Sequence, residues 1–368
     1  MSVTTDPSPS LAPMEQAGAA PTIEMTGVSR SFGTNPALLD LSVQVPAQRI
    51  TVLLGPNGAG KTTAIRMITG ALSPDAGTVR VFGLDPSVDG EEVRRRCGVV
   101  SAKPSLYDRL SGWDNLLYSA ELYGLGRGES AAAKIQAAAE RFGIDHALAQ
   151  QAGGYSTGMK TRLALARSVL HEPELLLFDE PTSGLDPESS IAVLDLIREM
   201  TRNGCTVVMC THLLLEAEGL ADQVVVLEEG HALIAGTPSE LTERYWPGAV
   251  VKLDAEDRAG LAALLDGAEG VLRHDQDGDD PLMVQLDDLG RIPDLVLALA
   301  REGVRLTRVE PHHPTLEDLY FAVRGRKRPE GGVVPRDTTA IEEVRLSSGN
   351  RLGRGFRDPF KASPGGDH

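Results

Sequence analysis

Cysteine is scarce in this sequence. The 368 residues include three, Cys97, Cys205 and Cys210, which lie in or beside the apolar runs RCGVVS and GCTVVMC. A thiol inside such a strand-like run behaves as a small hydrophobic group. We therefore expect buried, unpaired thiols rather than a disulfide or a metal site, as in a protein of the reducing cytosol.

Long apolar runs are also missing. No stretch of the sequence approaches the roughly 18 consecutive apolar residues that a membrane-spanning helix needs. The N-terminus has no charged segment followed by an apolar one, as a secretory leader would have. We expect a chain that does not enter a membrane by itself, although it could lie against one.

Basic residues are outnumbered, 36 to 52, so the net charge is −16. The balance is uneven, because residues 324–368 hold 10 basic and 6 acidic side chains, a charge of +4. Residues 1–323 therefore carry −20. Such a body does not attract nucleic acid in general. The basic end could touch anionic lipid, but a solvated, disordered tail is the commoner interpretation.

The order of short apolar runs and helical patterns predicts an α/β protein. Residues 1–20 are rich in Pro, Ala, Ser and Thr and are expected to be disordered. Residues 21–245 alternate apolar strands with helices, which favours a largely parallel, covered sheet. After a Pro/Gly break, residues 249–323 predict a small α+β domain, plausibly ferredoxin-like. Residues 324–368 are expected to be a disordered basic tail.

A glycine-rich segment follows the strand pattern RITVLL. GPNGAGKTT fits G-x-x-x-x-G-K-[ST], whose backbone N–H groups and helix N-terminus hold phosphate. Lys61 is placed to reach the β- and γ-phosphates, and the Thr62 hydroxyl to bind Mg²⁺. The nucleotide-binding residues expected here are Gly55, Pro56, Asn57, Gly58, Ala59, Gly60, Lys61, Thr62 and Thr63.

Two acidic residues end the apolar run ELLLFDE. Asp179 is carried to the end of a buried strand, where a carboxylate can hold Mg²⁺. Glu180 follows directly and is suitably placed to orient or deprotonate an attacking water. The competing interpretation is a solvated strand end without a chemical role.

Between these motifs lies YSTGMKTRLALARSVL, residues 155–170. Ser156, Thr157 and Gly158 open an amphipathic helix, so a hydroxyl and backbone amides point outward at its N-terminus. Alone, this pattern predicts an ordinary helix N-cap.

Together these motifs resemble the nucleotide-binding subunit of ABC transporters. The likeness spans about residues 22–240 and includes GPNGAGKTT, YSTGM, LLLFDE, SGLD at 183–186 and His212 after TVVMC, in the order of that family. It implies the family's P-loop cassette: a parallel-sheet core, an antiparallel β subdomain and a helical subdomain at about 104–170.

The resemblance also implies how the subunit works. Two subunits, expected to be a homodimer, would pack head to tail, with ATP and Mg²⁺ between Lys61 of one and the signature residues of the other. Phe32 would stack on adenine, Asp186 would link the two sites and His212 would sense the γ-phosphate. The alternatives are that Phe32 is a plain core residue, that Asp186 is a helix N-cap and that His212 is a surface histidine at a strand end. The implied signature residues are Ser156, Thr157, Gly158 and Met159.

YSTGM, GTPSEL at 236–241 and the terminal TLEDLYFAV resemble one branch of the family, which exports drugs, antibiotics, lipids or polysaccharides. This likeness implies a separately encoded permease that holds the ATPase at the cytoplasmic face of the membrane, with no nucleic acid as partner. Two other functions stay open: a non-transport ABC ATPase acting on ribosomes or DNA, and a slow regulatory nucleotide-binding subunit.

One position departs from the family pattern. In GVVSAKPSLYDRL, Ala102 stands where the family has a glutamine that touches Mg²⁺ and water. A methyl group can do neither, so the contact is absent or comes from Ser101, Lys103 or solvent. We expect ATP hydrolysis with a weakened metal contact.

Overall fold

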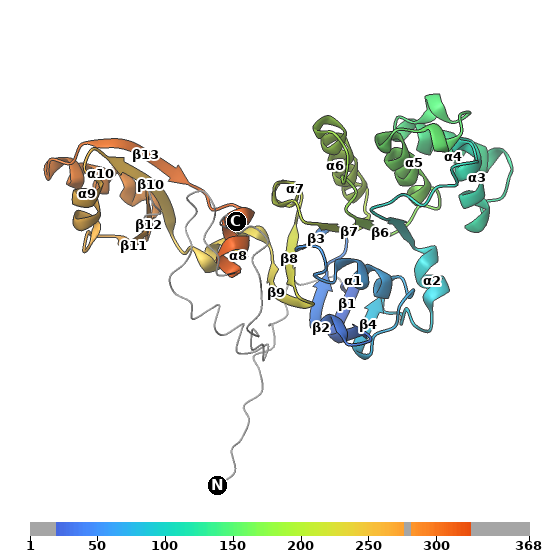
Figure 1. Cartoon of the computed structure of the whole chain (residues 1–368), viewed down its shortest axis with the longest axis horizontal. Coiled ribbons are helices and arrows are strands. Elements are labelled where there is room, and N and C mark those ends of the chain that lie inside the picture. Colours follow the sequence, from blue (N-terminus) through green and yellow to red (C-terminus); the bar gives the residue numbers. More distant parts are fainter. Residues whose placement is uncertain (1–19, 276–280, 325–368) are drawn as a thin grey trace, which may run out of the picture. The chain divides into compact units, whose positions relative to one another are not determined.

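The computed structural model describes residues 20–275 and 281–324 (Figure 1). All but one residue of each expected tail, 1–20 and 324–368, and most of the acidic turn DQDGDD, lie outside these residues. In the part of the chain that is described, no helix has both the length and the apolar character needed to cross a bilayer.

A six-stranded sheet forms the centre of the fold, in the order β5-β6-β7-β3-β8-β9. Neighbours from β5 to β8 are parallel, and β9 is antiparallel. The strands are β3 (Ile50–Leu54), β5 (Cys97–Val100), β6 (Leu175–Asp179), β7 (Thr206–Thr211), β8 (Gln223–Glu228) and β9 (His231–Gly236). The predicted, largely parallel sheet is confirmed.

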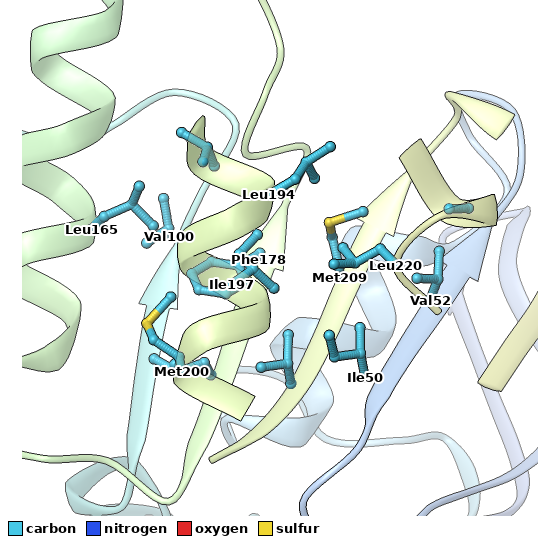
Figure 2. Close-up of a cluster of buried hydrophobic side chains, with 14 of the residues drawn as sticks. Ile50, Val52, Val100, Leu165, Phe178, Leu194, Ile197, Met200, Met209 and Leu220 are labelled. Atoms are coloured by element: carbon cyan, nitrogen blue, oxygen red, sulfur yellow. The ribbon is translucent and has the colours of Figure 1, made fainter. Parts of the chain in front are cut away.

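Both faces of this sheet are covered, which explains why its strands read as continuous apolar runs. Val52 and Phe178 belong to a cluster on one face, with Ile197 of helix α6 (Pro187–Arg202) (Figure 2). Leu53 belongs to a second cluster, with Ile65 of helix α1 (Lys61–Ile68). Alternate residues along one strand thus point into two separate cores.

Strand β5 is buried along only part of its length. Val100 is 1% exposed, but Val99 is 38% exposed. The cause is the strand order, which leaves β5 at an edge of the sheet. Strand β5 leads into the loop that begins with Ser101.

The three cysteines are free, as expected. Cys97 and Cys210 are buried, and Cys205 is partly buried. Burial raises the pKa of the Cys97 thiol to about 12. These thiols therefore act as apolar packing groups.

Two smaller groups of elements alternate along the chain with the strands of the central sheet. An antiparallel sheet has the order β2-β1-β4, and a helical group follows β5, with mutual contacts among α3, α4 and α5. The elements are β1 (Ile23–Phe32), β2 (Asn35–Val45), β4 (Ala76–Val81), α2 (Gly90–Arg95), α3 (Gly112–Leu122), α4 (Glu129–Arg141), the 3₁₀ turns η1 (Asp145–Ala147) and η2 (Ala152–Gly154), and α5 (Thr157–Val169).

The C-terminal part forms a four-stranded antiparallel sheet in the order β11-β12-β10-β13, with its own core. This order and the βαββαβ succession match the predicted ferredoxin-like arrangement. Its elements are β10 (Ala249–Ala255), α9 (Arg258–Leu265), β11 (Val271–Asp275), β12 (Leu282–Leu286), η3 (Leu289–Arg291), α10 (Ile292–Arg301) and β13 (Leu306–His312).

The last helix, α11 (Leu316–Val323), contacts α7 (Leu214–Glu218) and α8 (Pro238–Tyr245). Leu319 is 1% exposed and belongs to the same hydrophobic cluster as the central sheet. The Leu316 N–H donates to the Glu218 carboxylate over 3.2 Å. Arg324 donates to the Glu228 carboxylate over 2.8 Å. Helix α11 therefore packs on the part of the chain that contains the central sheet rather than on the C-terminal sheet alone.

The start of α11 gives a pH-dependent prediction. Burial raises the pKa of Asp318, but hydrogen bonds from His312 and Thr315 outweigh it and lower the pKa to about 2. Because the folded pKa lies below the ordinary 3.8, ionised Asp318 stabilises the fold above pH 4, by about 2 kcal/mol, and this contribution disappears between pH 4 and 2. We expect the unfolding free energy of Asp318→Asn to lie below that of the wild type at pH 5 and to converge with it near pH 2, in urea titrations. A constant difference across this range would contradict the assignment.

Candidate nucleotide-binding and hydrolytic site

The glycine-rich loop connects β3 to helix α1, as the motif predicts. Gly60 caps α1 with a φ of +103°, a conformation that side chains rarely adopt. A Cβ at Gly60 would lie 2.5 Å from the Ala37 carbonyl oxygen and 2.6 Å from the Leu38 side chain. The loop therefore lies directly against β2, and only glycine fits at this contact.

Lys61 is the first residue of α1 and is 5% exposed. Its Nζ donates to the carbonyl oxygens of Gly55, at 2.7 Å, and Pro56, at 3.2 Å. The same Nζ lies 3.7 Å from Glu180 Oε1. A buried cation is thus held inside the loop, next to the acidic end of β6.

Thr62 and Asp179 meet although 117 residues separate them. The Thr62 hydroxyl donates to Asp179 Oδ2 over 2.7 Å, and Asp179 is 9% exposed. One hydroxyl and one carboxylate side by side are oxygen ligands of the kind that Mg²⁺ accepts together with phosphate oxygens. Among the described residues, no group of three or more His, Cys, Asp or Glu could hold a metal ion. The residues present fit Mg²⁺ that is shared with a nucleotide.

Glu180 and His212 follow the neighbouring strands β6 and β7. His212 Nδ1 lies 3.1 Å from Glu180 Oε1. Glu180 has a φ of +52°, and its N–H donates to the Cys210 carbonyl over 2.9 Å. A glutamate in this left-handed conformation is strained, and strain of this kind gathers at functional sites. Glu180, which the sequence predicts to act in catalysis, therefore has an unusual backbone conformation, and its carboxylate lies beside a histidine.

A second group of predicted residues lies at the N-termini of α5 and α6. Ser156 caps α5 by accepting the Met159 N–H over 3.3 Å, and Asp186 caps α6 by accepting the Ser189 N–H over 2.9 Å. A Cβ placed on Gly158 would lie 3.8 Å from Ser189 Oγ, so the two helix starts are neighbours. The Ser189 N–H and hydroxyl lower the pKa of Asp186. Both N-cap interpretations are confirmed.

Two residues of the signature segment YSTGM, Tyr155 and Thr157, differ in environment. Tyr155 is 6% exposed, and its hydroxyl donates to the Ala147 carbonyl over 2.6 Å. Thr157 is exposed to solvent. Tyr155 is therefore an internal anchor, whereas the Thr157 hydroxyl is free to meet a ligand.

Phe32 ends strand β1 and is 45% exposed. The alternative that Phe32 is plain core is wrong, because the ring lies at the tip of the β1–β2 hairpin. The Arg30 guanidinium carbon lies 5.4 Å from the ring centre. An exposed ring on this hairpin can stack on a base.

The loop after β5 has no glutamine that could replace the missing contact. Ala102 and Lys103 are exposed, and the Ser101 hydroxyl donates to the Lys103 carbonyl over 2.8 Å. The hydroxyl named as a substitute is thus engaged within its own loop. The weakened metal contact stays a prediction.

Sequence reasoning missed Glu216 on α7. Its Oε2 accepts hydrogen bonds from the Thr182 hydroxyl, at 2.8 Å, and the Thr211 hydroxyl, at 3.3 Å. The only signal in the sequence is an acidic residue in the first turn of a short helix, which is an ordinary preference. Its contacts depend on tertiary packing.

Comparison with known sequences identifies the family. The family described as "ABC transporter" matches residues 38–183. The "Daunorubicin/doxorubicin resistance ATP-binding protein DrrA" of Streptomyces peucetius is 34% identical over 327 residues, 88% of this chain and 96% of that protein. The chain belongs to the ABC transporter ATP-binding proteins. It is an ABC ATPase.

Two further relatives fit this assignment. The ABC ATPase is 36% identical to the "ABC transporter ATP-binding protein NatA" of Bacillus subtilis (strain 168), over 60% of this chain and 92% of that protein. It is 32% identical to the "Nod factor export ATP-binding protein I" of Rhizobium meliloti (strain 1021), over 84% of this chain and 90% of that protein.

Solved structures match the fold of the ABC ATPase. One described as "Structure of ATP binding subunit of ABC transporter" has a TM-score of 0.56 and 28% identity, covering 61% of this chain and 93% of that one. Another, cbiO1 from Clostridium perfringens, "Part of the ABC transporter complex cbiONQ", has a TM-score of 0.55 and 26% identity, covering 61% and 91%. The expected cassette fold is confirmed.

Proposed function

We propose that this ABC ATPase powers an exporter, with Glu180 as the general base of ATP hydrolysis. The main observation in support is that Glu180 lies close to both Lys61 and His212. The Thr62–Asp179 pair lies beside them. Five polar side chains from three separate segments, namely the start of α1, the end of β6 and the end of β7, converge there, and each has the chemistry that phosphoryl transfer requires.

ATP binding is assigned to the glycine-rich loop and Phe32. The loop's backbone N–H groups and the N-terminus of α1 attract phosphate charge. Lys61 neutralises the β- and γ-phosphates, and Phe32 stacks on adenine. The proposed loop residues are Gly55, Pro56, Asn57, Gly58, Ala59, Gly60, Lys61, Thr62 and Thr63.

Mg²⁺ would be held by Thr62 and Asp179 together with the phosphates. When bound, it neutralises charge on the transferred phosphoryl group. Glu180 orients a water molecule and takes its proton, which raises the nucleophilicity of the water oxygen. His212, within hydrogen-bond distance of Glu180 Oε1, donates to the γ-phosphate and keeps the carboxylate in place.

A second copy of the chain is proposed to complete the site. Lys61 and Glu180 lie in one group of site residues, and Ser156 and Gly158 in another at the starts of α5 and α6. In a head-to-tail homodimer, the second group of one protomer would face the ATP of its partner. The residues proposed for this role are Ser156, Thr157, Gly158, Met159 and Asp186.

A separate permease is proposed to hold the ATPase at the cytoplasmic face of the membrane. The names of two relatives, for drug resistance and Nod factor export, support export as the direction. Tyr107 and Tyr118 support a docking surface on the helical group, because they are 50% and 42% exposed and their rings are 5.1 Å apart. Leu116, which lies on α3 with Tyr118, is buried and belongs to the core.

ATP-dependent dimerisation tests this proposal. With Mg²⁺ and ATP, the full-length Glu180→Gln chain is expected to move from the 39.2 kDa monomer to twice that mass in light scattering, because slowed hydrolysis preserves the ATP between the protomers. Ser156→Arg in the same background should abolish the shift. Ser111 caps α3 in the same way, so Ser111→Arg is the matched control and should dimerise. A chain that stays monomeric at saturating ATP would refute the proposed dimer.

A further inference from the structure

Glu216 joins the two segments that carry the hydrolytic pair. Thr182 lies two residues after Glu180, and Thr211 directly precedes His212. Both threonine hydroxyls donate to the same carboxylate oxygen, Glu216 Oε2. The carboxylate therefore bridges the turn after β6 and the end of β7.

Both threonines of this bridge are buried. Thr182 is 4% exposed and Thr211 is 1% exposed, so both hydroxyls need partners inside the protein. The Thr211 hydroxyl also accepts the Leu213 N–H over 3.0 Å, at the start of α7. Hydrogen bonds to a charged acceptor are stronger than neutral ones. Glu216 thus anchors Thr182 through a short bond of 2.8 Å and Thr211 through a longer one of 3.3 Å.

The strained backbone of Glu180 gives such an anchor a role. A positive φ at a glutamate persists only where the surroundings determine it. The Glu180 N–H bonds the Cys210 carbonyl, and two residues later Thr182 bonds Glu216. The turn after β6 is therefore tied to β7 directly and, through Glu216, to α7.

We propose that Glu216 is a positioning residue for ATP hydrolysis, holding Glu180 and His212 in register through Thr182 and Thr211. The inference rests on the proposed role of Glu180 as the general base. Glu216 itself bonds neither Glu180 nor His212 among the contacts described, so its effect passes through the two threonines.

The same helix supplies a matched control. Glu218 lies two residues after Glu216 on α7, but it accepts the Leu316 N–H of α11. Glu216 and Glu218 have the same charge and lie on one five-residue helix. A role of Glu216 that only stabilised α7 would be shared by Glu218.

The test compares steady-state ATPase activity of full-length variants. Glu216→Ala should lower kcat about 10- to 100-fold, the effect of a misplaced reacting group, with the Kd for ATP unchanged within twofold. Glu216→Gln should retain activity within about threefold, because one amide oxygen can accept both hydroxyls. Thr182→Val should lower kcat and Thr182→Ser should restore it. Glu218→Ala should act like the wild type.

Two results would overturn the proposal: a kcat for Glu216→Ala within twofold of the wild type, or an equal loss in Glu218→Ala. The Glu180→Gln variant, measured alongside, separates this failure from a failure of the general-base assignment. If Glu180→Gln loses turnover while Glu216→Ala does not, only the positioning role is wrong. If Glu180→Gln keeps turnover, the assignment on which the inference rests is wrong.

Discussion

Replacing Glu180 with glutamine is expected to lower ATP turnover by about 10²–10⁴-fold, the usual contribution of a general base. Glutamine keeps the size of the side chain and can still accept a hydrogen bond from His212, but it cannot take a proton from water. ATP binding should persist, because Lys61, Thr62 and the loop backbone are unchanged. Phosphate release and equilibrium binding of a fluorescent ATP analogue measure the two quantities separately.

Glu172 offers a close control for this substitution. It also has a positive φ, of 55°, and its carboxylate accepts a hydrogen bond from a lysine, Lys134, at 2.9 Å. Glu172→Gln therefore reproduces the loss of a strained, lysine-paired glutamate away from the site. We expect normal turnover in this variant. Near-normal hydrolysis in Glu180→Gln would remove Glu180 from the mechanism.

Gly55→Ala is expected to weaken ATP binding at least tenfold and to lower the melting temperature. A Cβ at Gly55 would lie 2.3 Å from the Leu227 carbonyl oxygen and 3.2 Å from the Ala59 Cβ. Because the first obstacle is the backbone of strand β8, relief requires a shift of the loop, and overpacking of this kind costs roughly 1–3 kcal/mol. Isothermal titration with ATP and thermal unfolding would measure the two effects.

Gly128→Ala serves as the control for this change. No atom lies within 4 Å of a Cβ at Gly128, and its φ of −77° suits alanine. Both affinity and melting temperature should stay near the wild-type values. If Gly55→Ala binds ATP as tightly as Gly128→Ala does, the close approach to Leu227 has no bearing on the loop.

The sequence predicted the parts of the site that depend on local geometry. The glycine-rich loop needs only a strand, a turn and a helix in succession, and all three lie within twenty residues. The same holds for Asp179 at a strand end and for the caps at Ser156 and Asp186, because capping depends on the first helical turn.

The remaining features depend on contacts between distant segments. Strand order decides that β5 is an edge strand and that Val99 is exposed, and the apolar run around Val99 contains no information about its neighbours. The bridge from Glu216 needs two threonines, one 34 residues before it. In the local pattern of α7, Glu216 differs from Glu218 only by lying in the first turn, which is an ordinary position for an acidic residue.

The packing of α11 has a consequence for chain topology. Helices α8 and α11 share one hydrophobic cluster, which also includes Val250 of β10 and Met283 of β12, while the other face of the C-terminal sheet forms a second cluster with α9 and α10. In topological terms, the ferredoxin-like unit is therefore an insertion into the nucleotide-binding part, and not an appendage after it. A chain cut after Tyr245 would lose Leu319 and Tyr320 from that cluster and uncover apolar side chains beside α7. Replacing the ferredoxin-like unit by a short linker from Trp246 to Thr315 would remove it and leave α11 packed against α7 and α8.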